Sequence, residues 1–328
     1  MMRKLLMVLC IGCASGPSSA QLITYLDATG YPLMYSSRVG KQVVIMDKYA
    51  RPTAFMPILD GSLPTTKPLG EIEPLILPKT VLTNDKPLPY LPIEEDNPFL
   101  GWRGIRFTLD HPDIFLIQLR AMLRASAESG NLSILLPMVS GVKELDDAIS
   151  LINQAYSEAV LLDDRIQFPQ VGVMIEVPSM VYLLPTIAHR VDFVSVGTND
   201  LTQYLLAVDR NNSRVADVYE SMHPAVLLAL KQIHDVCDKY QVPVCICGEL
   251  AGDPFGALLL LGLGYTSLSM NTSNVAKVKY LIRHSQQEEL EKLAEQAMTK
   301  SYGEDIHQMM HDFFIQQGFA GFIRAGKK

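Results

Sequence analysis

The sequence lacks the features that mark disulfide-rich secreted proteins and nucleic-acid-binding proteins. It holds only five cysteines in 328 residues, and two of them, Cys10 and Cys13, lie near the N-terminus. An odd number placed in this way indicates no disulfide framework, and no His/Cys spacing is typical of a zinc site. Lys and Arg form no cluster and the net charge is −7. Nucleic acids and anionic membrane surfaces are therefore disfavoured as partners, because both need a concentrated positive field.

Apolar runs long enough to span a membrane are also missing. The N-terminal run, residues 5–13, has about nine residues, whereas a membrane-spanning helix needs about 20. Arg3 and Lys4 precede this run and the small residues Ser18–Ala20 follow it, so residues 1–20 have the layout of a secretory signal. A buried or frayed N-terminal strand is the alternative. A cleaved signal would export the chain, whereas the rest of the sequence predicts a cytoplasmic protein.

Two regions of different character follow this segment. Residues 21–84 are rich in Pro, Gly and Thr, and only short apolar runs such as Val43–Met46 stand out. This pattern predicts at most a few strands and no helix in a divergent region. Residues 85–328 carry a regular alternation and are predicted to form one domain with closing C-terminal helices. A composition of 48% hydrophobic and 19% charged residues is that of a compact globular protein.

Short apolar runs alternate with helical patterns from residue 85 onward. The apolar runs are 132–137, 171–176, 191–197, 242–248 and 266–270. Helical periodicity marks 114–127, 142–161, 180–190, 224–240, 255–263, 286–297 and 305–317. Strands that are apolar on both faces and alternate with helices indicate a parallel sheet covered by helices. We therefore predict an α/β fold of the (β/α)8 barrel type, with an open doubly wound sheet as the alternative.

Polar side chains come at the ends of these predicted strands. Glu176 ends one strand, Asn199 and Asp200 follow the next, and Cys247 ends a third. Asp200 comes 24 residues after Glu176, which suits one strand, one helix and two loops, so both carboxylates would return to the same rim. Mg²⁺ takes one or two carboxylates together with substrate phosphate and water. The alternative is that Glu176 caps a helix and Asp200 begins one.

Arg103, Arg210 and Cys247 each allow two interpretations. Arginine donates two parallel hydrogen bonds to phosphate or carboxylate, but an arginine in a loop is more often solvated or salt-bridged. Cys247 is either a small buried hydrophobic residue or a thiol that donates a proton to a carbanion-like intermediate. The residues alone leave these alternatives open.

Four longer strings resemble enzyme I of the bacterial phosphotransferase system. They are Asn97–Arg106, Leu119–Ser126, Val196–Arg210 (with Gly-Thr-Asn-Asp-Leu within it) and Cys247–Asp253. Shorter strings at 177–180, 221–224 and 321–324 are closer to the nitrogen-branch form of that enzyme than to the sugar-branch form. The resemblance extends from about Asp85 to the C-terminus, roughly three-quarters of the chain. Strings of this length and order are highly specific.

This resemblance implies a site for phosphoenolpyruvate and Mg²⁺ on a (β/α)8 barrel. Glu176 and Asp200 match the family's metal ligands. Asn199, the Asp200 backbone and Arg210 match its phosphoenolpyruvate contacts, and Arg103 matches a further site arginine. Cys247 matches the proton donor that converts enolpyruvate to pyruvate. In the family, a histidine on a separate domain accepts the phosphoryl group and passes it to a phosphocarrier protein, and the barrel forms a homodimer.

Two departures from the family stand out. Two upstream strings with phosphate-binding arginines are missing, and at 79–86 only Asp85 and Lys86 match. The first two barrel strands are therefore predicted to be incomplete or altered. None of the seven histidines lies in the Gly-rich Ser/Thr-His setting of the phosphorylated histidine. The domain that carries the acceptor is thus expected to be absent, and the chain to be a truncated form.

Three functional hypotheses follow. In the first, the chain is the Mg²⁺-dependent phosphoenolpyruvate-binding part of a phosphoenolpyruvate–protein phosphotransferase that cannot phosphorylate itself. The second is a non-catalytic remnant of enzyme I that acts in dimerisation or regulation. The third, an exported protein, depends on residues 1–20 alone.

Overall fold

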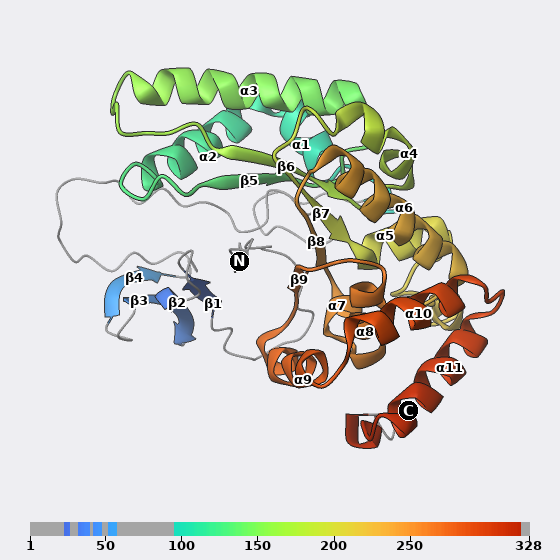
Figure 1. Cartoon of the computed structure of the whole chain (residues 1–328). Helices are drawn as coiled ribbons and strands as arrows, with labels where there is room; N and C mark the ends of the chain where they lie inside the picture. Colours follow the sequence, from blue (N-terminus) through green and yellow to red (C-terminus); the bar gives the residue numbers. More distant parts are fainter. Residues whose placement is uncertain (1–22, 27–31, 40–41, 48–51, 58–94, 323–328) are drawn as a thin grey trace. The chain divides into compact units, whose positions relative to one another are not determined.

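The fold is described from a computed structural model of the chain (Figure 1). The described residues are 23–26, 32–39, 42–47, 52–57 and 95–322. By its contacts the chain divides into two units, Met1–Ile76 and Leu77–Lys328. The signal-like segment 1–20 and the altered string at 79–86 lie outside the described residues.

The first unit contains a four-stranded antiparallel sheet. Its strands are β1 (Ile23–Leu26), β2 (Pro32–Val39), β3 (Gln42–Asp47) and β4 (Pro52–Pro57), paired in the order β1-β2-β3-β4. Each strand pairs with the next one along the chain, so short connections suffice. The expected few strands without a helix are what the described residues of this region form.

The second unit contains a five-stranded parallel sheet. Its strands are β5 (Ser133–Leu136), β6 (Gln170–Ile175), β7 (Phe193–Gly197), β8 (Val244–Cys247) and β9 (Leu268–Ser269). They pair in sequence order, β5-β6-β7-β8-β9, and every pair is parallel. All five strands predicted from apolar runs are thereby confirmed.

Helices connect and flank these strands. They are α1 (Ile105–Asp110), α2 (Pro112–Ala125), α3 (Val142–Val160), α4 (Pro178–Ile187), α5 (Thr198–Leu205), α6 (Pro224–Tyr240), α7 (Glu249–Gly252), α8 (Pro254–Gly262), α9 (Thr272–Arg283), α10 (Gln287–Met298) and α11 (Gly303–Gln316). Two 3-10 turns, Ala216–Val218 and Ala320–Phe322, complete the described elements. The seven helices predicted from periodicity are confirmed. The periodicity did not predict α1, α5, α7 and α9, of which all but α9 have eight residues or fewer.

The expected barrel of eight strands is not closed in the described part of the chain. The parallel sheet there has five strands, and the four strands of the first unit pair with one another instead. The doubly wound alternative is wrong, because such a sheet reverses its strand order at a switch point. The consecutive order observed here is that of a sheet wound in one direction, as in a barrel.

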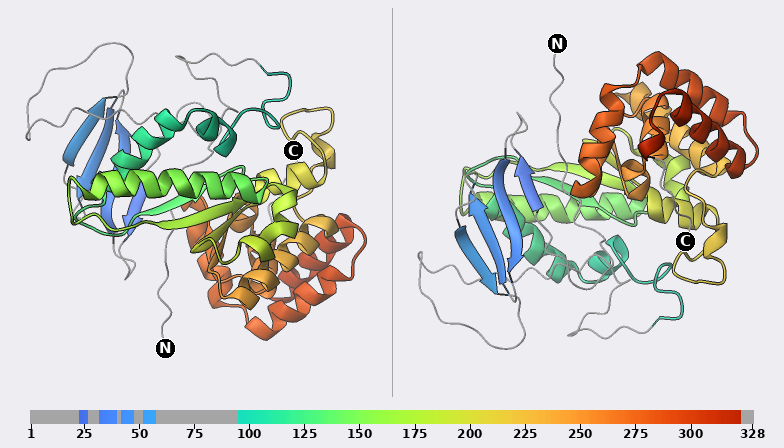
Figure 2. Two further views of the ribbon diagram at one scale, coloured as in Figure 1. Left: turned by 90° about the horizontal axis from the view of Figure 1, so that it is seen from above. Right: turned by 90° about the horizontal axis from the view of Figure 1, so that it is seen from below.

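The two faces of the parallel sheet have different environments. Residues of one face, such as Val173, Val194, Val196 and Ile246, belong to the main hydrophobic core. Helices α2, α3, α4, α6 and α8 contribute to the same core, and α3 lies beside α2 over this face (Figures 1 and 2). Because side chains alternate along a strand, the residues between them, Ser195 included, point to the opposite face.

Local sequence explains where the core helices begin and which face they bury. Pro112 stands in the first turn of α2, where its missing amide hydrogen costs nothing. Phe115, Leu119 and Leu123 then recur every fourth residue and are buried. In α3, the Glu144 carboxylate accepts the amide hydrogens just before the helix. Among the described residues, no helix combines the length and apolarity needed to cross a membrane.

Ile246→Ala should lower the free energy of unfolding by about 2–5 kcal/mol, because it opens a cavity in the fully buried centre of β8. The matched control is Ile117→Ala on α2, where the side chain is 51% exposed. That change should stay within about 0.5 kcal/mol. Urea unfolding followed by circular dichroism measures both. Equal effects of the two substitutions would contradict the assigned core.

Candidate functional site

The predicted site residues lie at the carboxyl ends of three neighbouring strands. Glu176 directly follows β6, Asp200 lies in the first turn of α5 directly after β7, and Cys247 is the last residue of β8. Gly197 is paired with Cys247 across β7 and β8. The sheet thus brings side chains far apart in the sequence to one edge, as the spacing predicted.

Glu176 and Asp200 form a buried pair of carboxyl groups. Glu176 is only 3% exposed, and its Oε1 accepts a hydrogen bond from the Met138 amide at 2.6 Å. Burial, and then the adjacent charge of Asp200, raises the pKa of Glu176 to about 8. At neutral pH and without a cation, Glu176 therefore holds a proton.

Two arginines contact Asp200 from different loops. Arg103 Nη2 donates to Asp200 Oδ2 at 3.2 Å, and Arg210 Nη2 lies 3.7 Å from Asp200 Oδ1. Arg103 is 4% exposed, so it is not the solvated loop arginine that its position in the sequence also allowed. A buried guanidinium needs such a partner, because an uncompensated buried charge is strongly destabilising.

Tyr204 supports Arg103, and sequence reasoning missed it. Arg103 Nη1 donates to the Tyr204 hydroxyl at 3.2 Å, and that hydroxyl donates to the carbonyl of Phe99. Burial raises the pKa of Tyr204 to about 12, so the hydroxyl keeps its proton. Tyr204 comes four residues after Asp200 on α5, hence on the same helix face. That spacing is the signal that could have found it.

Two glycines permit the close approach of the strand ends. A Cβ on Gly197 would lie 3.0 Å from Glu176 Oε2. Gly248, just after β8, has φ +121°, and a Cβ there would lie 2.3 Å from the Thr198 hydroxyl. Both positions bring α5 and the end of β8 against the carboxylate pair, which a larger residue would prevent.

Asn199 and the Arg210 loop are fixed by a second set of contacts. Asn199 Oδ1 accepts a hydrogen bond from the Glu249 amide at 3.1 Å, which joins α5 to the start of α7. The Tyr219 hydroxyl donates to the Asn199 carbonyl at 3.3 Å. The Arg210 amide donates to Gln203 Oε1 at 3.2 Å. The loop after α5 is therefore held near the site by both its ends.

Cys247 is buried among polar groups of the neighbouring strand. Its Sγ lies 3.2 Å from the Val196 carbonyl and 3.3 Å from the Ser195 hydroxyl. Cys245 lies two residues earlier on β8, and its thiol donates to the Ser195 hydroxyl at 3.4 Å. The Cys247 thiol is thus hydrogen-bonded, which differs from a cysteine that serves only as a small hydrophobic residue.

The structure tests the helix-terminus alternative for the two acidic residues. The helix-capping alternative for Glu176 is wrong, because Val177 is the N-cap of α4 and no side chain caps that helix. Asp200 does begin a helix, in the first turn of α5. There the N-terminal end of the helix favours its negative charge. The two interpretations of Asp200 are therefore compatible.

The carboxylate pair suits a hard divalent cation. Asp200 Oδ1 is buried and accepts no hydrogen bond from the described residues, which leaves an oxygen available as a ligand. Glu176 would lose its proton to a cation, since positive charge lowers the pKa of a neighbouring carboxyl group. Within the described ranges, no group of three or more His, Cys, Asp or Glu side chains forms a metal site. Two carboxylates are nevertheless the usual protein contribution to a Mg²⁺ site.

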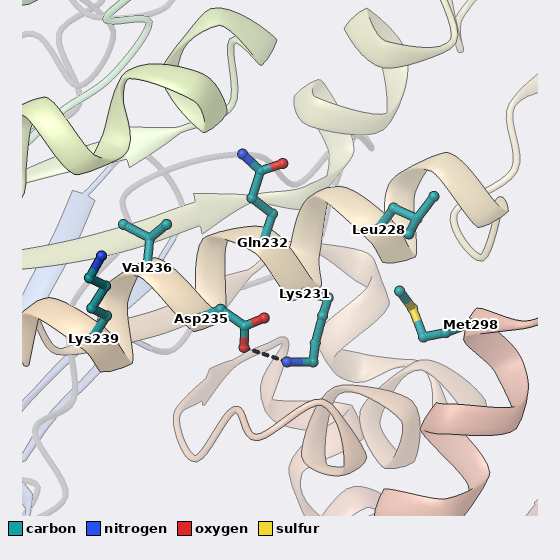
Figure 3. A pocket seen from close by; sticks show the side chains of 7 residues that line it. All are labelled: Leu228, Lys231, Gln232, Asp235, Val236, Lys239 and Met298. Atoms are coloured by element: carbon teal, nitrogen blue, oxygen red, sulfur yellow. Dashed lines mark hydrogen bonds and ion pairs between the residues drawn. The ribbon is translucent and has the colours of Figure 1, made fainter.

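A hollow on α6 is separate from this cluster. It is lined by Leu228, Lys231, Gln232, Asp235, Val236, Lys239 and Met298 (Figure 3). Lys231 and Asp235 form an ion pair within it, so its main opposite charges already neutralise each other. None of the predicted site residues lines this hollow. The carboxylate cluster remains the stronger candidate, because its buried charges converge.

Glu176→Gln should flatten the pH dependence of stability in the metal-free chain. Between the ordinary pKa of 4.5 and about 8, folded Glu176 keeps a proton that unfolded Glu176 has lost. The free energy of unfolding therefore falls as pH rises through this window, by up to about 1.4 kcal/mol per pH unit. Gln cannot ionise, so the variant loses this slope. Denaturant unfolding at pH 5, 6, 7 and 8 measures it, and the exposed Glu291→Gln is the control. A variant with the slope of the unsubstituted chain would contradict the buried, protonated Glu176.

Comparison with known proteins indicates the family to which the chain belongs. Residues 73–287 match the phosphoenolpyruvate-binding domain of phosphoenolpyruvate-utilising enzymes. A phosphoenolpyruvate-dependent phosphotransferase system protein of Salmonella typhimurium is 53% identical over 243 residues, 74% of this chain and 32% of that protein. Its Escherichia coli K12 counterpart is 52% identical over the same shares. A phosphoenolpyruvate–protein phosphotransferase of Haemophilus influenzae is 43% identical over 71% of this chain and 40% of its own length.

The chain spans about a third of the length of the first two of these relatives. A solved citrate lyase from Burkholderia xenovorans LB400 has a TM-score of 0.39 at 15% identity, over 63% of this chain and 68% of that one. A similarity this weak supports no conclusion about this chain. The resemblance to phosphotransferase enzymes is confirmed, while the nitrogen-branch assignment stays a prediction. Since the family match covers more than half of its residues, the chain belongs to the phosphoenolpyruvate-utilising enzymes, the family of the phosphoenolpyruvate–protein phosphotransferases.

Proposed function

We propose that the chain supplies the Mg²⁺-dependent phosphoenolpyruvate-binding domain of a phosphoenolpyruvate–protein phosphotransferase. Such an enzyme transfers the phosphoryl group of phosphoenolpyruvate to a histidine and releases pyruvate. One observation carries the proposal: the buried pair Glu176 and Asp200, flanked by Arg103 and Arg210, at the carboxyl edge of a parallel sheet. Family membership sets the substrate class, and this cluster supplies the charges that the substrate needs.

The charges of the cluster fit a phosphate ester together with a divalent cation. The guanidinium charges of Arg103 and Arg210 balance the two carboxylates when both are ionised. The double charge of the cation would then remain to attract phosphoenolpyruvate. This local excess operates in a chain whose net charge is −7, so attraction at the site depends on these few groups and not on the whole surface.

In this proposal Glu176 and Asp200 hold Mg²⁺, and Arg103, Arg210 and Asn199 bind phosphoenolpyruvate. The ion, when bound, neutralises charge on the transferring phosphoryl group. Arg210 is partly exposed within the loop that follows α5, so it can turn from Asp200 to a phosphate oxygen. Arg103 is held by both Asp200 and Tyr204 and would keep Asp200 in place. Positioning and charge neutralisation are the main demands of phosphoryl transfer.

Cys247 is the proposed proton donor to the enolpyruvate that remains after transfer. It lies at the end of β8, paired with Gly197 beside Glu176. Its S–H bond would break as a C–H bond forms at the methylene carbon of the enolate. The electron pair stays on sulfur, and the enolate becomes pyruvate. Water then returns a proton to the thiolate.

The same proposal includes further assignments of fold, family branch, assembly, partner and location. They are the barrel fold for residues 85–328, similarity to the nitrogen-branch enzyme, a homodimer, a phosphocarrier protein as partner of the complete enzyme, and a cytoplasmic location. The consecutive order of the five parallel strands supports the barrel. The missing upstream arginine strings predict weaker binding than in the complete family site. Each lost charge-assisted contact costs about 1.5–3 kcal/mol.

Calorimetric titration tests the proposal directly. The chain should bind phosphoenolpyruvate in the presence of Mg²⁺ and lose most of that affinity in its absence. Asp200→Asn keeps an oxygen for Arg103 but removes a ligand charge, so it should weaken binding by at least about tenfold. Asp235→Asn, a surface change within the α6 hollow, should leave the affinity unchanged.

Two outcomes would overturn the proposal. One is Mg²⁺-independent binding that Asp200→Asn does not alter. The other is the absence of binding at millimolar phosphoenolpyruvate by a folded chain. In the second case, a dimer mass by light scattering in the same samples would favour the alternative of a non-catalytic dimerisation or regulatory module.

A further inference from the structure

Ser195 lies on the same face of the sheet as Cys245 and Cys247, two residues before the carboxyl end of β7, where the candidate site lies. The register pairs Ser195 with Met174 of β6 on one side and Cys245 of β8 on the other. Residues paired across a sheet share a face. The Ser195 side chain therefore points away from the main hydrophobic core, toward the face that carries Glu176 and Cys247. It is completely buried there, at 0% exposure.

The Ser195 hydroxyl links the two thiols of β8. Its Oγ lies 3.4 Å from Cys245 Sγ and 3.3 Å from Cys247 Sγ. Cys247 Sγ in turn lies 3.2 Å from the carbonyl oxygen of Val196. These contacts form one continuous chain of hydrogen-bonding groups, which ends at a backbone carbonyl.

That carbonyl fixes the direction of the chain. A carbonyl oxygen can only accept, so the Cys247 thiol donates its single proton to Val196. Ser195 must then donate to Cys247 Sγ. Its own oxygen remains to accept from the Cys245 thiol. The hydroxyl proton of Ser195 is therefore already directed at the Cys247 sulfur in the resting state.

A proton donor of this kind develops negative charge on sulfur as it reacts. A hydrogen bond that already points at that sulfur stabilises the thiolate without reorganisation, which is the most effective form of electrostatic assistance. The contact to Val196 has the opposite property, because it needs the proton that Cys247 gives away. Of the contacts from Ser195 and to Val196, the one from Ser195 is thus the contact that gains strength during proton transfer.

We propose that Ser195 is a positioning residue for the Cys247 proton donor: its hydroxyl orients the thiol and stabilises the thiolate formed when enolpyruvate takes the proton. The inference rests on the proposed function for its chemical purpose. In the step itself, the S–H bond of Cys247 breaks and a C–H bond forms on enolpyruvate. The electron pair stays on sulfur, where the Ser195 O–H group donates to it, until water reprotonates the thiolate.

The ionisable groups around Cys247 that belong to the described residues can be held constant. On its own strand there is Cys245. Cys247 is paired with Gly197 of β7, and Glu176 lies next to Gly197, with Asp200 beside it on α5. Glu249, two residues further along the chain, is exposed at the start of α7. A comparison at position 195 leaves all four of these groups in place.

The pH dependence of alkylation tests the inference without phosphoenolpyruvate. The full chain is treated with iodoacetamide from pH 6 to 10, and tandem mass spectrometry localises the adduct on Cys247. Ser195→Ala should move the midpoint of the alkylation rate upward by about one pH unit, the size expected for one lost hydrogen bond to a charged group. Ser195→Thr keeps the hydroxyl and should retain the original midpoint. Ser133→Ala, on β5 at the other end of the sheet, is the matched control and should also retain it.

Circular dichroism shows whether each variant is folded. A folded Ser195→Ala chain with the midpoint of Ser133→Ala overturns the inference, and so does a Ser195→Thr chain that shifts as far as Ser195→Ala. If Ser195→Ala does not fold, Cys245→Ala decides. This variant lacks the thiol that donates to the Ser195 oxygen and so keeps the Ser195 proton directed at Cys247. An upward shift of the alkylation midpoint by less than about one pH unit supports the inference, and an unchanged midpoint overturns it.

Failure of the proposed function gives a different result. A chain that binds no phosphoenolpyruvate but shows the shift in Ser195→Ala would keep the effect of Ser195 on the thiol and reject the proposed substrate. A chain that binds phosphoenolpyruvate but shows no shift in Ser195→Ala would keep the proposed substrate and reject the effect of Ser195 on the thiol.

Discussion

The site depends on one buried electrostatic arrangement, the Glu176–Asp200 carboxyl pair held against Arg103. Two neighbouring negative charges are unfavourable where water is excluded, and the raised pKa of Glu176 reflects this cost. The Arg103 guanidinium compensates Asp200 and the Met138 amide compensates Glu176. What remains among the described residues is a Glu176 carboxyl group that stays protonated and an Asp200 Oδ1 that accepts no hydrogen bond. A divalent cation would relieve both conditions.

The parallel sheet is what makes this arrangement possible. Strands that run in the same direction end at the same edge, so residues 24 and 47 positions apart along the chain, from Glu176 to Asp200 and on to Cys247, become neighbours. One face of the sheet is occupied by the hydrophobic core. The other carries Ser195, Cys245 and Cys247. The fold thus separates stability and chemistry onto opposite faces of the same strands.

The sequence predicted most of the second unit and most of the site. Apolar runs and helical periodicity are strong signals there, so all five strands and seven helices were found, although the 12-residue α9 was missed. Short helices such as α5 and α7 were also missed, because eight residues or fewer carry too little periodicity. Barrel closure was also not observed among the residues that the structure describes. It depends on strands before residue 95, where Pro-rich and Gly-rich sequence offers no regular pattern.

Within the site, charged and reactive side chains could be predicted, whereas their supports could not. Glu176, Asp200, Arg103 and Arg210 do converge as expected. The Met138 amide contact depends on a left-handed backbone at φ 59°, which no side-chain pattern announces. Ser195 is an ordinary small residue in a buried strand. Its importance follows only from the register that sets it between two thiols.

Location of a bound divalent cation tests the central claim most directly. Crystals of the chain soaked in Mn²⁺ alone give an anomalous signal that marks the ion without reference to any expected site. The account predicts a peak in contact with the carboxylates of both Glu176 and Asp200. A folded chain whose only ordered Mn²⁺ lies elsewhere, with Glu176 and Asp200 unchanged, would contradict it.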